Sequence, residues 1–409
     1  MRPSKDFVQV AMPGFNRAGD IFQYLRDGVP RTRIELAELT GFARSTIFSR
    51  IQTLADAGLV MNVGDARSSG GRPATRFAFN PSGRVLLGIE VGAERTTVAL
   101  TDLIGQIIAR VAFDHPPTAG PTEVFDRARD KAEDLLESTG DRSKDLIGVG
   151  IGLPGPVERS AGRPVRLPTL PGWDGFDVAG YVSRAFPVPV LVDNDINLMA
   201  LGEQRTFWPD TKNLLFIRVA SGVGMGIISS GALQRGADGS AGDLGHVAVG
   251  RGSDMLCDCG NYGCLEALAG APAVARSLTG SAEADVANLI VLGQRGDVRA
   301  STALRQAGRD IGSVLAGCVN MLNPSVVVVS GPIVEAGDSV LAGIREVVYK
   351  RSLPLATARL TIAKSQAMHD VGVIGAASMV AEHVLSPLAI ENMLAAARLD
   401  DGAPVAVSA

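Results

Sequence analysis

Val85-Leu86-Leu87-Gly88-Ile89-Glu90-Val91 is an almost wholly apolar run. From this point the sequence pattern changes from short helical segments to apolar, strand-like runs. Such a run is typical of a strand buried on both faces. Two strand-like runs, 95–102 and 107–111, follow at hairpin spacing, and a helical pattern over 122–138 precedes another apolar strand at 147–153. Strands interspersed with helices in this way predict an α/β fold.

The same order of elements returns further along the chain. Residues 213–219 form a second apolar run, 224–228 follows closely, and a helix over about 301–320 precedes the strand 326–329. We therefore predict a tandem α/β architecture of two lobes with a ligand cleft between them.

Composition limits the class of protein. The chain has 409 residues, which suggests two or three domains, and 46% of them are hydrophobic, which excludes general disorder. No apolar stretch reaches the roughly 18 residues of a membrane span, and residues 1–15 lack the apolar segment of a secretory signal. We expect a cytoplasmic protein that does not enter a membrane.

Residues 1–80 differ from the rest in charge, at net +4 against −8 for the remainder. Three short helices are predicted here: one after a possible cap at Asp20, one over 32–39 with Thr32 and Glu35 as a capping box, and one over about 44–57. Gly41 permits a sharp turn between the second and third. Two helices joined in this way describe a helix-turn-helix, and the basic balance fits DNA.

The third helix has two unlike faces. Ile47, Ile51 and Leu54 fall at helical spacing and are expected in the core, whereas the opposite face carries hydroxyls and arginine that can approach phosphates and bases. We expect the DNA contacts to be Arg33, Arg44, Ser45, Thr46, Ser49, Arg50 and Arg72.

A wing is predicted after this helix. Residues 59–63 and 75–79 read as two strands around a tip, 64–73, in which Gly70-Gly71-Arg72-Pro73 offers an arginine to a minor groove. The alternative for residues 1–80 is a small helical bundle that binds protein or packs on the main domain.

The strongest local chemistry is His246 followed by Cys257-Asp258-Cys259-Gly260-Asn261-Tyr262-Gly263-Cys264. Three thiolates this close, with glycines that bend the loop, can converge with His246 on one ion in a tetrahedral Cys₃His site. No ligand position stays open, so we expect structural zinc, which would fix the loop that carries Glu266. The alternative is three ordinary buried thiols and a core histidine; Cys318, in an apolar helix, reads as core.

At this point the chain resembles the ROK family (repressor, open reading frame, kinase), in particular its regulators. The resemblance covers nearly the whole chain. It implies a winged helix-turn-helix at 1–80, an actin-like, sugar-kinase-like, ATPase-type domain of two lobes at 81–390, and a tail at 391–409. Its most specific marks are Ala241–His246, 257–266, 192–197 and 150–157.

The resemblance also implies a set of sugar contacts. Asp195 stands at the position of the family's catalytic base, and Asp243 stands where the family usually has Glu. Thr169 stands where Asn is common. The implied ligand-binding residues are Asn194, Asp195, Asp243, His246 and Glu266.

The phosphate loops depart from those of the kinases that this chain resembles. Those kinases carry Asp-x-Gly-Gly-Thr after the first strand, whereas this chain has Glu90-Val91-Gly92-Ala93-Glu94, and it has Gly331-Pro332 for a later Gly-Gly. A carboxylate at Glu94 repels ATP phosphates and supplies no hydroxyl donor. We therefore expect no bound ATP, no kinase activity and a vestigial base at Asp195.

Together these observations predict a transcription regulator, a repressor, of sugar metabolism. Its partners would be operator DNA and a sugar or sugar phosphate effector, and it would act as a homodimer or a dimer of dimers. The alternatives are an active sugar kinase with a DNA-binding head, a regulator with a vestigial sugar site controlled by a protein partner, and a scaffold that does not bind DNA.

Overall fold

A computed structural model describes residues 17–65, 74–140, 145–158, 161–165, 170–280, 285–366 and 370–400. Contacts divide the chain into two units. The first contains the described parts of Met1–Val85, Asp102–Ile104 and Ala381–Ala409, and the second contains those of Leu86–Thr101 and Gly105–Val380.

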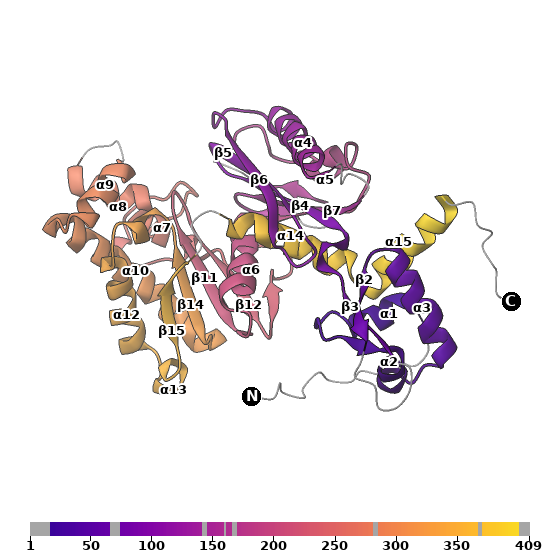
Figure 1. The fold of residues 1–409 in the computed structure, drawn as a ribbon. Coiled ribbons are helices and arrows are strands. Elements are labelled where there is room, and N and C mark those ends of the chain that lie inside the picture. Colours follow the sequence, from indigo (N-terminus) through magenta and orange to yellow (C-terminus); the bar gives the residue numbers. More distant parts are fainter. Residues whose placement is uncertain are drawn as a thin grey trace. The chain divides into compact units, whose positions relative to one another are not determined.

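The described residues up to Phe79 contribute three α-helices and a small sheet of order β1-β3-β2 to the first unit (Figure 1). The predicted capping box is present, because the Thr32 side chain accepts from Glu35 N and Glu35 accepts from Thr32 N. Gly41 ends the helix at φ 74°. The elements are α1 Ala18–Gln23, β1 Arg31–Thr32, α2 Arg33–Thr40, α3 Arg44–Asp56, β2 Val60–Asp65 and β3 Thr75–Phe79.

The core of this unit follows the predicted helix faces. Ile47, Ile51 and Leu54 of α3 are fully buried. Phe22 packs edge-on against Phe79, with ring centroids 5.4 Å apart. The cap predicted at Asp20 is wrong, because α1 begins at Ala18 and Asp20 lies in its first turn.

The end of the chain also belongs to the first unit. Helix α15 (Pro387–Asp400) contacts α1, and Gly19 N donates to Glu391 Oε1 at 2.9 Å. A Cβ on Gly19 would lie 2.2 Å from the carbonyl oxygen of Pro387, so glycine lets the two helices approach this closely. The tail predicted from residue 391 is therefore helical through Asp400.

The second unit contains two five-stranded sheets with the same strand order, β6-β5-β4-β7-β10 and β13-β12-β11-β14-β15. In each sheet two hairpins are followed by strands that pair in parallel, so the repeat predicted from the sequence is a duplicated α/β topology. The strands are β4 Val85–Val91, β5 Arg95–Thr101, β6 Ile107–Asp114, β7 Leu146–Leu153 and β10 Val190–Asn194, then β11 Leu214–Val219, β12 Val223–Ser229, β13 Ala232–Gln234, β14 Val326–Ser330 and β15 Thr361–Lys364.

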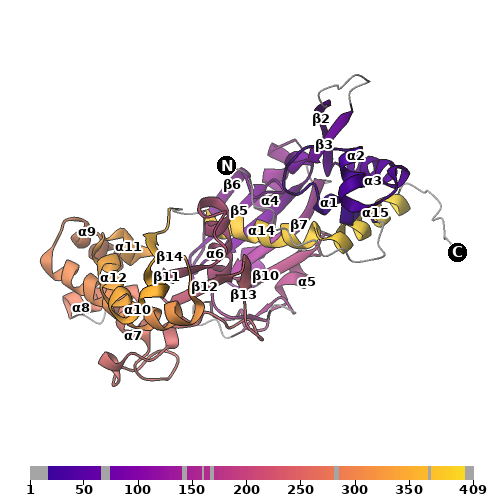
Figure 2. The ribbon, with the colours of Figure 1, turned by 90° about the horizontal axis from the view of Figure 1, so that it is seen from below.

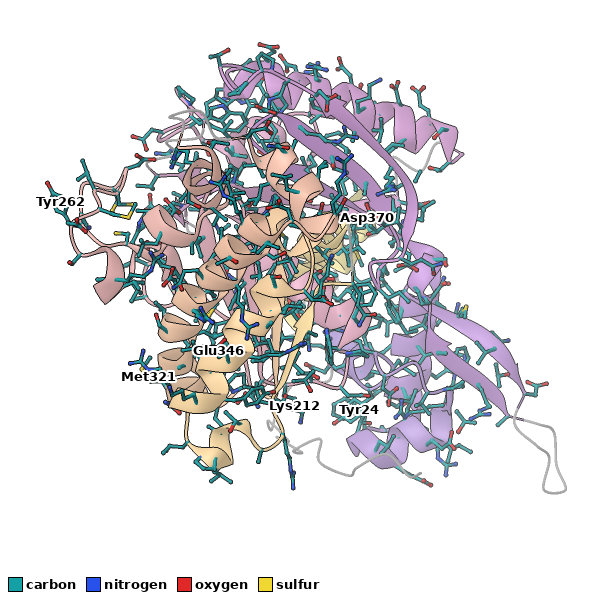
Figure 3. The ribbon with its side chains drawn as sticks, turned by 90° about the vertical axis from the view of Figure 1, so that its left-hand side faces the viewer. Tyr24, Lys212, Tyr262, Met321, Glu346 and Asp370 are labelled. Atoms are coloured by element: carbon teal, nitrogen blue, oxygen red, sulfur yellow. The ribbon has the colours of Figure 1, made fainter. Side chains whose placement is uncertain are left out.

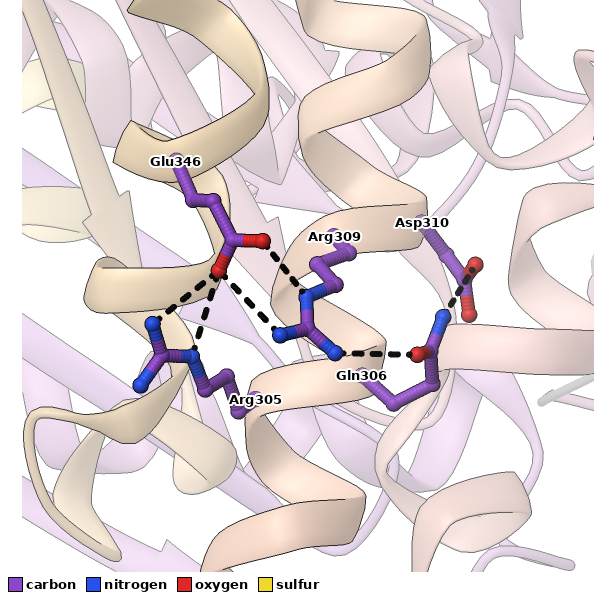
Figure 4. Close-up of polar contacts among 5 residues, drawn as sticks. All are labelled: Arg305, Gln306, Arg309, Asp310 and Glu346. Atoms are coloured by element: carbon purple, nitrogen blue, oxygen red, sulfur yellow. Dashed lines mark hydrogen bonds and ion pairs between the residues drawn. The ribbon is translucent and has the colours of Figure 1, made fainter.

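Helices cover these sheets. The larger ones are α4 Pro121–Ser138, α6 Asp195–Phe207, α10 Val298–Leu322, α12 Ser339–Arg351 and α14 Val371–Val384; between them lie α5 Val178–Val182, α7 Leu265–Ala269, α8 Ala271–Thr279, α9 Val286–Gln294, α11 Pro332–Glu335 and α13 Pro354–Thr357. In the second lobe α10 and α12 pack side by side. Glu346 of α12 accepts hydrogen bonds from Arg305 and Arg309 of α10, and Gln306 joins Arg309 to Asp310 (Figure 4).

Helix α14 lies directly against β4, β7 and α6 because glycines face it (Figure 2). A Cβ on Gly88 would lie 2.3 Å from the Val373 carbonyl oxygen, and one on Gly150 would lie 2.0 Å from that of Ala376. Among the described residues, no single helix has the length and hydropathy to cross a membrane; α14 and α15 meet those limits only as a pair bent by 74°.

Gly150→Ala is expected to destabilise the second unit by about 1–3 kcal/mol, because backbone must move to admit the methyl group. Gly317→Ala is the matched control, since nothing lies within 4 Å of its added Cβ in the C-terminal part of α10. That change is expected to stabilise the helix by about 0.5–1 kcal/mol. Urea denaturation followed by circular dichroism measures both, and equal midpoints for the two variants would contradict the packing of α14.

Candidate functional site

His246, Cys257, Cys259 and Cys264 come together at the N-terminal end of α7. Their donor atoms all lie within 4.8 Å of one another, so the group could hold one metal ion. Cys259 Sγ and Cys264 Sγ are 3.7 Å apart, and Cys257 Sγ is 3.7 Å from His246 Nδ1. Two thiolates bound to one tetrahedral zinc at about 2.3 Å lie about 3.8 Å apart, so these distances fit that ion.

The backbone fixes the loop that holds the three cysteines. Gly260 and Gly263 have φ of 89° and 76°, which only glycine adopts readily. Cys257 N donates to Asn261 O at 2.8 Å, and Tyr262 is exposed at the outer end of the loop (Figure 3). Burial raises the pKa of Cys264 to about 12, and a bound cation would oppose this because metal ligands are thiolates.

The other ring nitrogen of His246 faces Asp243. His246 Nε2 and Asp243 Oδ1 are 4.0 Å apart, and the Asp243 side chain is 58% exposed. A carboxylate on the far side of a metal-binding imidazole orients the ring and selects its tautomer. At 4.0 Å the Asp243 carboxylate, predicted to bind ligand, lies near the His246 ring but beyond hydrogen-bond distance.

Asn194 and Asp195 lie where β10 passes into α6. The Asn194 side chain caps the helix by accepting from Ile196 N and Asn197 N, and its Nδ2 donates to Gly155 O at 2.8 Å. These bonds use Oδ1 of Asn194 twice and one of its two Nδ2 hydrogens. Asp195 Oδ1 accepts from Ile196 N at 2.9 Å.

Asp195 is paired with Arg218, which lies outside the motifs quoted from the sequence. Asp195 Oδ2 lies 3.5 Å from Arg218 Nη1, and the Asp195 side chain is 12% exposed. Burial raises the pKa of Asp195, and the Arg218 guanidinium opposes that change. Burial also raises the pKa of Glu90, at the end of β4, to about 7, again opposed by Arg218.

Asp193 and Arg235 form a second ion pair nearby. Arg235 Nε donates to the buried Asp193 at 2.5 Å, and Asn197 and the backbone N of Asn194 donate to the same carboxylate. The pair joins β10 of the first sheet to the segment after β13, which leads to Asp243 and His246. No sequence motif predicts a role for Arg218 or Arg235, because the role of each comes from an ion pair with a residue that is distant in the sequence.

Glu266 begins α7 and is tied to the strand hairpin. Its Oε2 accepts from Val223 N at 2.9 Å, which leaves Oε1 for another donor. Two hollows are lined by other residues: one of about 350 Å³ between α4 and α5, and one of about 420 Å³ between residues 247–250 and α10. Neither hollow is lined by Asn194, Asp195 or Glu266.

The residues predicted to contact DNA are placed unequally. Arg44, Ser45 and Ser49 are exposed at the N-terminal half of α3, and Thr46 and Arg50 are half-buried. Phe48 and Gln52 share the exposed face and were not predicted. The wing tip with Arg72 lies outside the described residues, as does Thr169.

Arg33 is held by aromatic rings. Its guanidinium carbon lies 4.4 Å from the Phe48 ring centroid and 4.5 Å from that of Phe77. Such stacking is a cation–π interaction. It links α2 to α3 and the wing, which gives Arg33 a role in shaping the exposed face.

A unit of short helices with a small three-stranded sheet is joined in this chain to a duplicated α/β domain with a Cys₃His cluster, and this combination defines the class of protein. The profile of the ROK family matches residues 86–383, and the chain belongs to this family. The chain is 30% identical to the xylose repressor of Bacillus spizizenii over 359 residues, which cover 87% of this chain and 92% of that one. It is 26% identical to the DNA-binding transcriptional dual regulator NagC of Escherichia coli, over 89% and 92% of the two chains.

Solved structures agree with this assignment. The crystal structure of a ROK family transcriptional regulator, a homolog of the E. coli MLC protein, aligns with a TM-score of 0.79 at 24% identity, over 92% of this chain and 98% of that one. A ROK hexokinase from Thermus thermophilus aligns with a TM-score of 0.64 at 26% identity, over 75% and 99%. The alignment with the regulator covers 92% of this chain, and the alignment with the hexokinase covers 75%.

Proposed function

We propose that this protein is a DNA-binding transcription regulator of sugar metabolism, acting as a repressor, whose ROK domain senses a sugar without phosphorylating it. One observation carries the proposal: the chain aligns over 92% of the length both of the xylose repressor of Bacillus spizizenii and of the DNA-binding transcriptional dual regulator NagC. The short helices and small sheet of its first unit support it, because they are the elements that a winged helix-turn-helix requires. A kinase of the same family matches a smaller share of the chain.

The DNA-binding surface would be the exposed face of α3. Arg44 and Ser45 are exposed at its N-terminus, where backbone N–H groups also favour phosphate. Ser49, one turn further on, would reach base edges in the major groove. The wing would add contacts in the neighbouring groove.

Arg44→Ala is expected to weaken binding to the DNA upstream of the protein's own gene, and to reduce the slope of log affinity against log salt by about 1, because one phosphate contact is lost. Fluorescence anisotropy at several salt concentrations measures both. Arg295→Ala, exposed in the second unit, is the control and should bind as the unchanged protein does. Equal affinity and slope for the two variants would exclude Arg44 from the interface.

The sensing site would be formed by Asn194, Asp195, Asp243, His246 and Glu266. Asp195 and the free oxygen of Glu266 offer acceptors for sugar hydroxyls. In a homodimer, or a dimer of dimers, sugar binding would change the spacing of two DNA-binding heads. Half-sites lie about one helical turn or its multiples apart, so a small change in spacing alters operator affinity.

Three features support a domain that does not transfer phosphate. Glu94 brings a carboxylate to the turn between β4 and β5, where the kinases of this family use Thr. Asp195 is paired with Arg218, and a carboxylate held by a guanidinium is a weaker general base. At Gly331-Pro332, packing explains the glycine, since a Cβ there would lie 2.1 Å from Val219 O. Pro332 has no N–H, so it cannot donate a backbone hydrogen bond to a phosphate.

No ATP turnover above background is expected with glucose, xylose or N-acetylglucosamine. A coupled assay of ADP release measures this, with Asp195→Asn as the control for contaminating kinases. A rate that depends on sugar and falls in the Asp195→Asn variant would show a working kinase and would overturn this part of the proposal.

The metal would be zinc, bound by His246, Cys257, Cys259 and Cys264. The donor set and its distances fit a tetrahedral structural site, in which every ligand position is filled by protein. The ion would hold the loop before α7, and hence Glu266, in place. Arg251, just before this loop, is anchored on the buried Asp310 of α10.

Elemental analysis is expected to find one zinc ion per chain, lost in Cys259→Ser together with several degrees of thermal stability, because the loop loses its crosslink. Cys318→Ala is the matched control; Cys318 lies buried in α10 outside the cluster, so this variant should keep its zinc. A zinc-free protein of unchanged stability would refute the structural role.

A further inference from the structure

Arg218 is a charged residue of the second lobe that lies outside the motifs by which the chain resembles its family. It stands opposite Gly224 in the β11–β12 pair, on the face of the sheet that α6 covers, since a Cβ on Gly224 would meet Ile196. This position brings its guanidinium to the first turn of α6, beside Asp195.

The guanidinium has donors to spare. Within the described part of the chain its polar contacts are Asp195 Oδ2 at 3.5 Å and Met199 Sδ at 3.2 Å. A guanidinium has five N–H donors, and about a third of the Arg218 side chain is exposed. Donors therefore remain for a ligand that reaches Asp195.

The charges around Arg218 are already balanced. Asp195 pairs with it directly, and Glu90 interacts with both groups electrostatically. The Arg218–Asp195 pair has no net charge, so it has no surplus positive charge to offer an anion.

We propose that Arg218 and Asp195 together bind neighbouring hydroxyl groups of an uncharged sugar, and that this pair discriminates against the phosphorylated form of the same sugar. Asp195 accepts from one hydroxyl while Arg218 donates to the next oxygen. A phosphate would place up to two negative charges beside Asp195 and Glu90, or would have to displace Asp195 from its partner. The inference rests on the proposed sugar sensing and names the class of effector.

Calorimetry on the full-length protein, purified with its zinc, tests the discrimination with three matched pairs: glucose, mannose and N-acetylglucosamine, each against its 6-phosphate. We expect at least one uncharged sugar to bind, with its phosphate binding at least ten-fold more weakly. A phosphate that binds as tightly as its parent sugar would overturn the inference and leave sensing intact. Binding by none of the six compounds would remove sensing and this inference together.

Variants separate recognition from a merely structural role. Arg218→Met should weaken binding of the uncharged sugar by about ten- to hundred-fold, because charge-assisted hydrogen bonds are lost. Asp195→Asn keeps the shape of the side chain but frees the Arg218 charge, so the preference for the uncharged form should shrink by ten-fold or more. Arg95→Met, at an exposed pair with Asp114, is the control and should change neither value.

Equal weakening of the sugar and its phosphate in Asp195→Asn would show that the pair only supports the fold, and would contradict the proposal. Melting curves and zinc content of each variant confirm that a lost affinity does not come from lost structure.

Discussion

The close approach of α14 to the first sheet is the constraint on which much of the second unit depends. Gly88 and Gly150 leave no side chain between the strands and the helix backbone, and Gly202 does the same for α6. The helix that carries Asp195 is thereby held against the sheet whose strand carries Glu90. From the end of α14 the chain enters the first unit, where α15 contacts α1. The backbone of α14 thus packs against β4, β7 and α6, and the chain continues from it into the first unit.

Electrostatics distinguish this chain from the kinases that share its fold. A kinase needs an available carboxylate at the base position and donors for the phosphates. Here Arg218 pairs with the Asp195 carboxylate. Glu94 stands in the turn between β4 and β5, where the kinases have a hydroxyl that can donate to a phosphate. Under the proposed function, the pairing that weakens Asp195 as a base also provides a neighbouring donor and acceptor for the hydroxyl groups of a sugar.

The Cys₃His cluster and the two faces of α3 were both predictable from short stretches of sequence. The Cys257, Cys259 and Cys264 spacing is local, so a turn of eight residues was enough to predict convergence, and the donor atoms do converge. The faces of α3 were also predictable, because helical periodicity alone decides which side chains point inward. Arg33 shows the limit: its stacking on Phe48 and Phe77 depends on how α2, α3 and β3 meet.

The sequence by itself determined the duplicated α/β order, the capping box of α2, the Cys₃His cluster and the family. These are set by period, spacing and capping chemistry within short stretches of chain. Only the tertiary structure revealed the pairing of Arg218 with Asp195, that of Arg235 with Asp193, and the place of α15 beside α1. Arg218 and Asp195 are 23 positions apart in the chain, and Arg235 and Asp193 are 42 apart. Gly19 of α1 and Glu391 of α15 are 372 apart. Local propensity carries no information about which distant partner neutralises a buried charge, because that choice is made by packing.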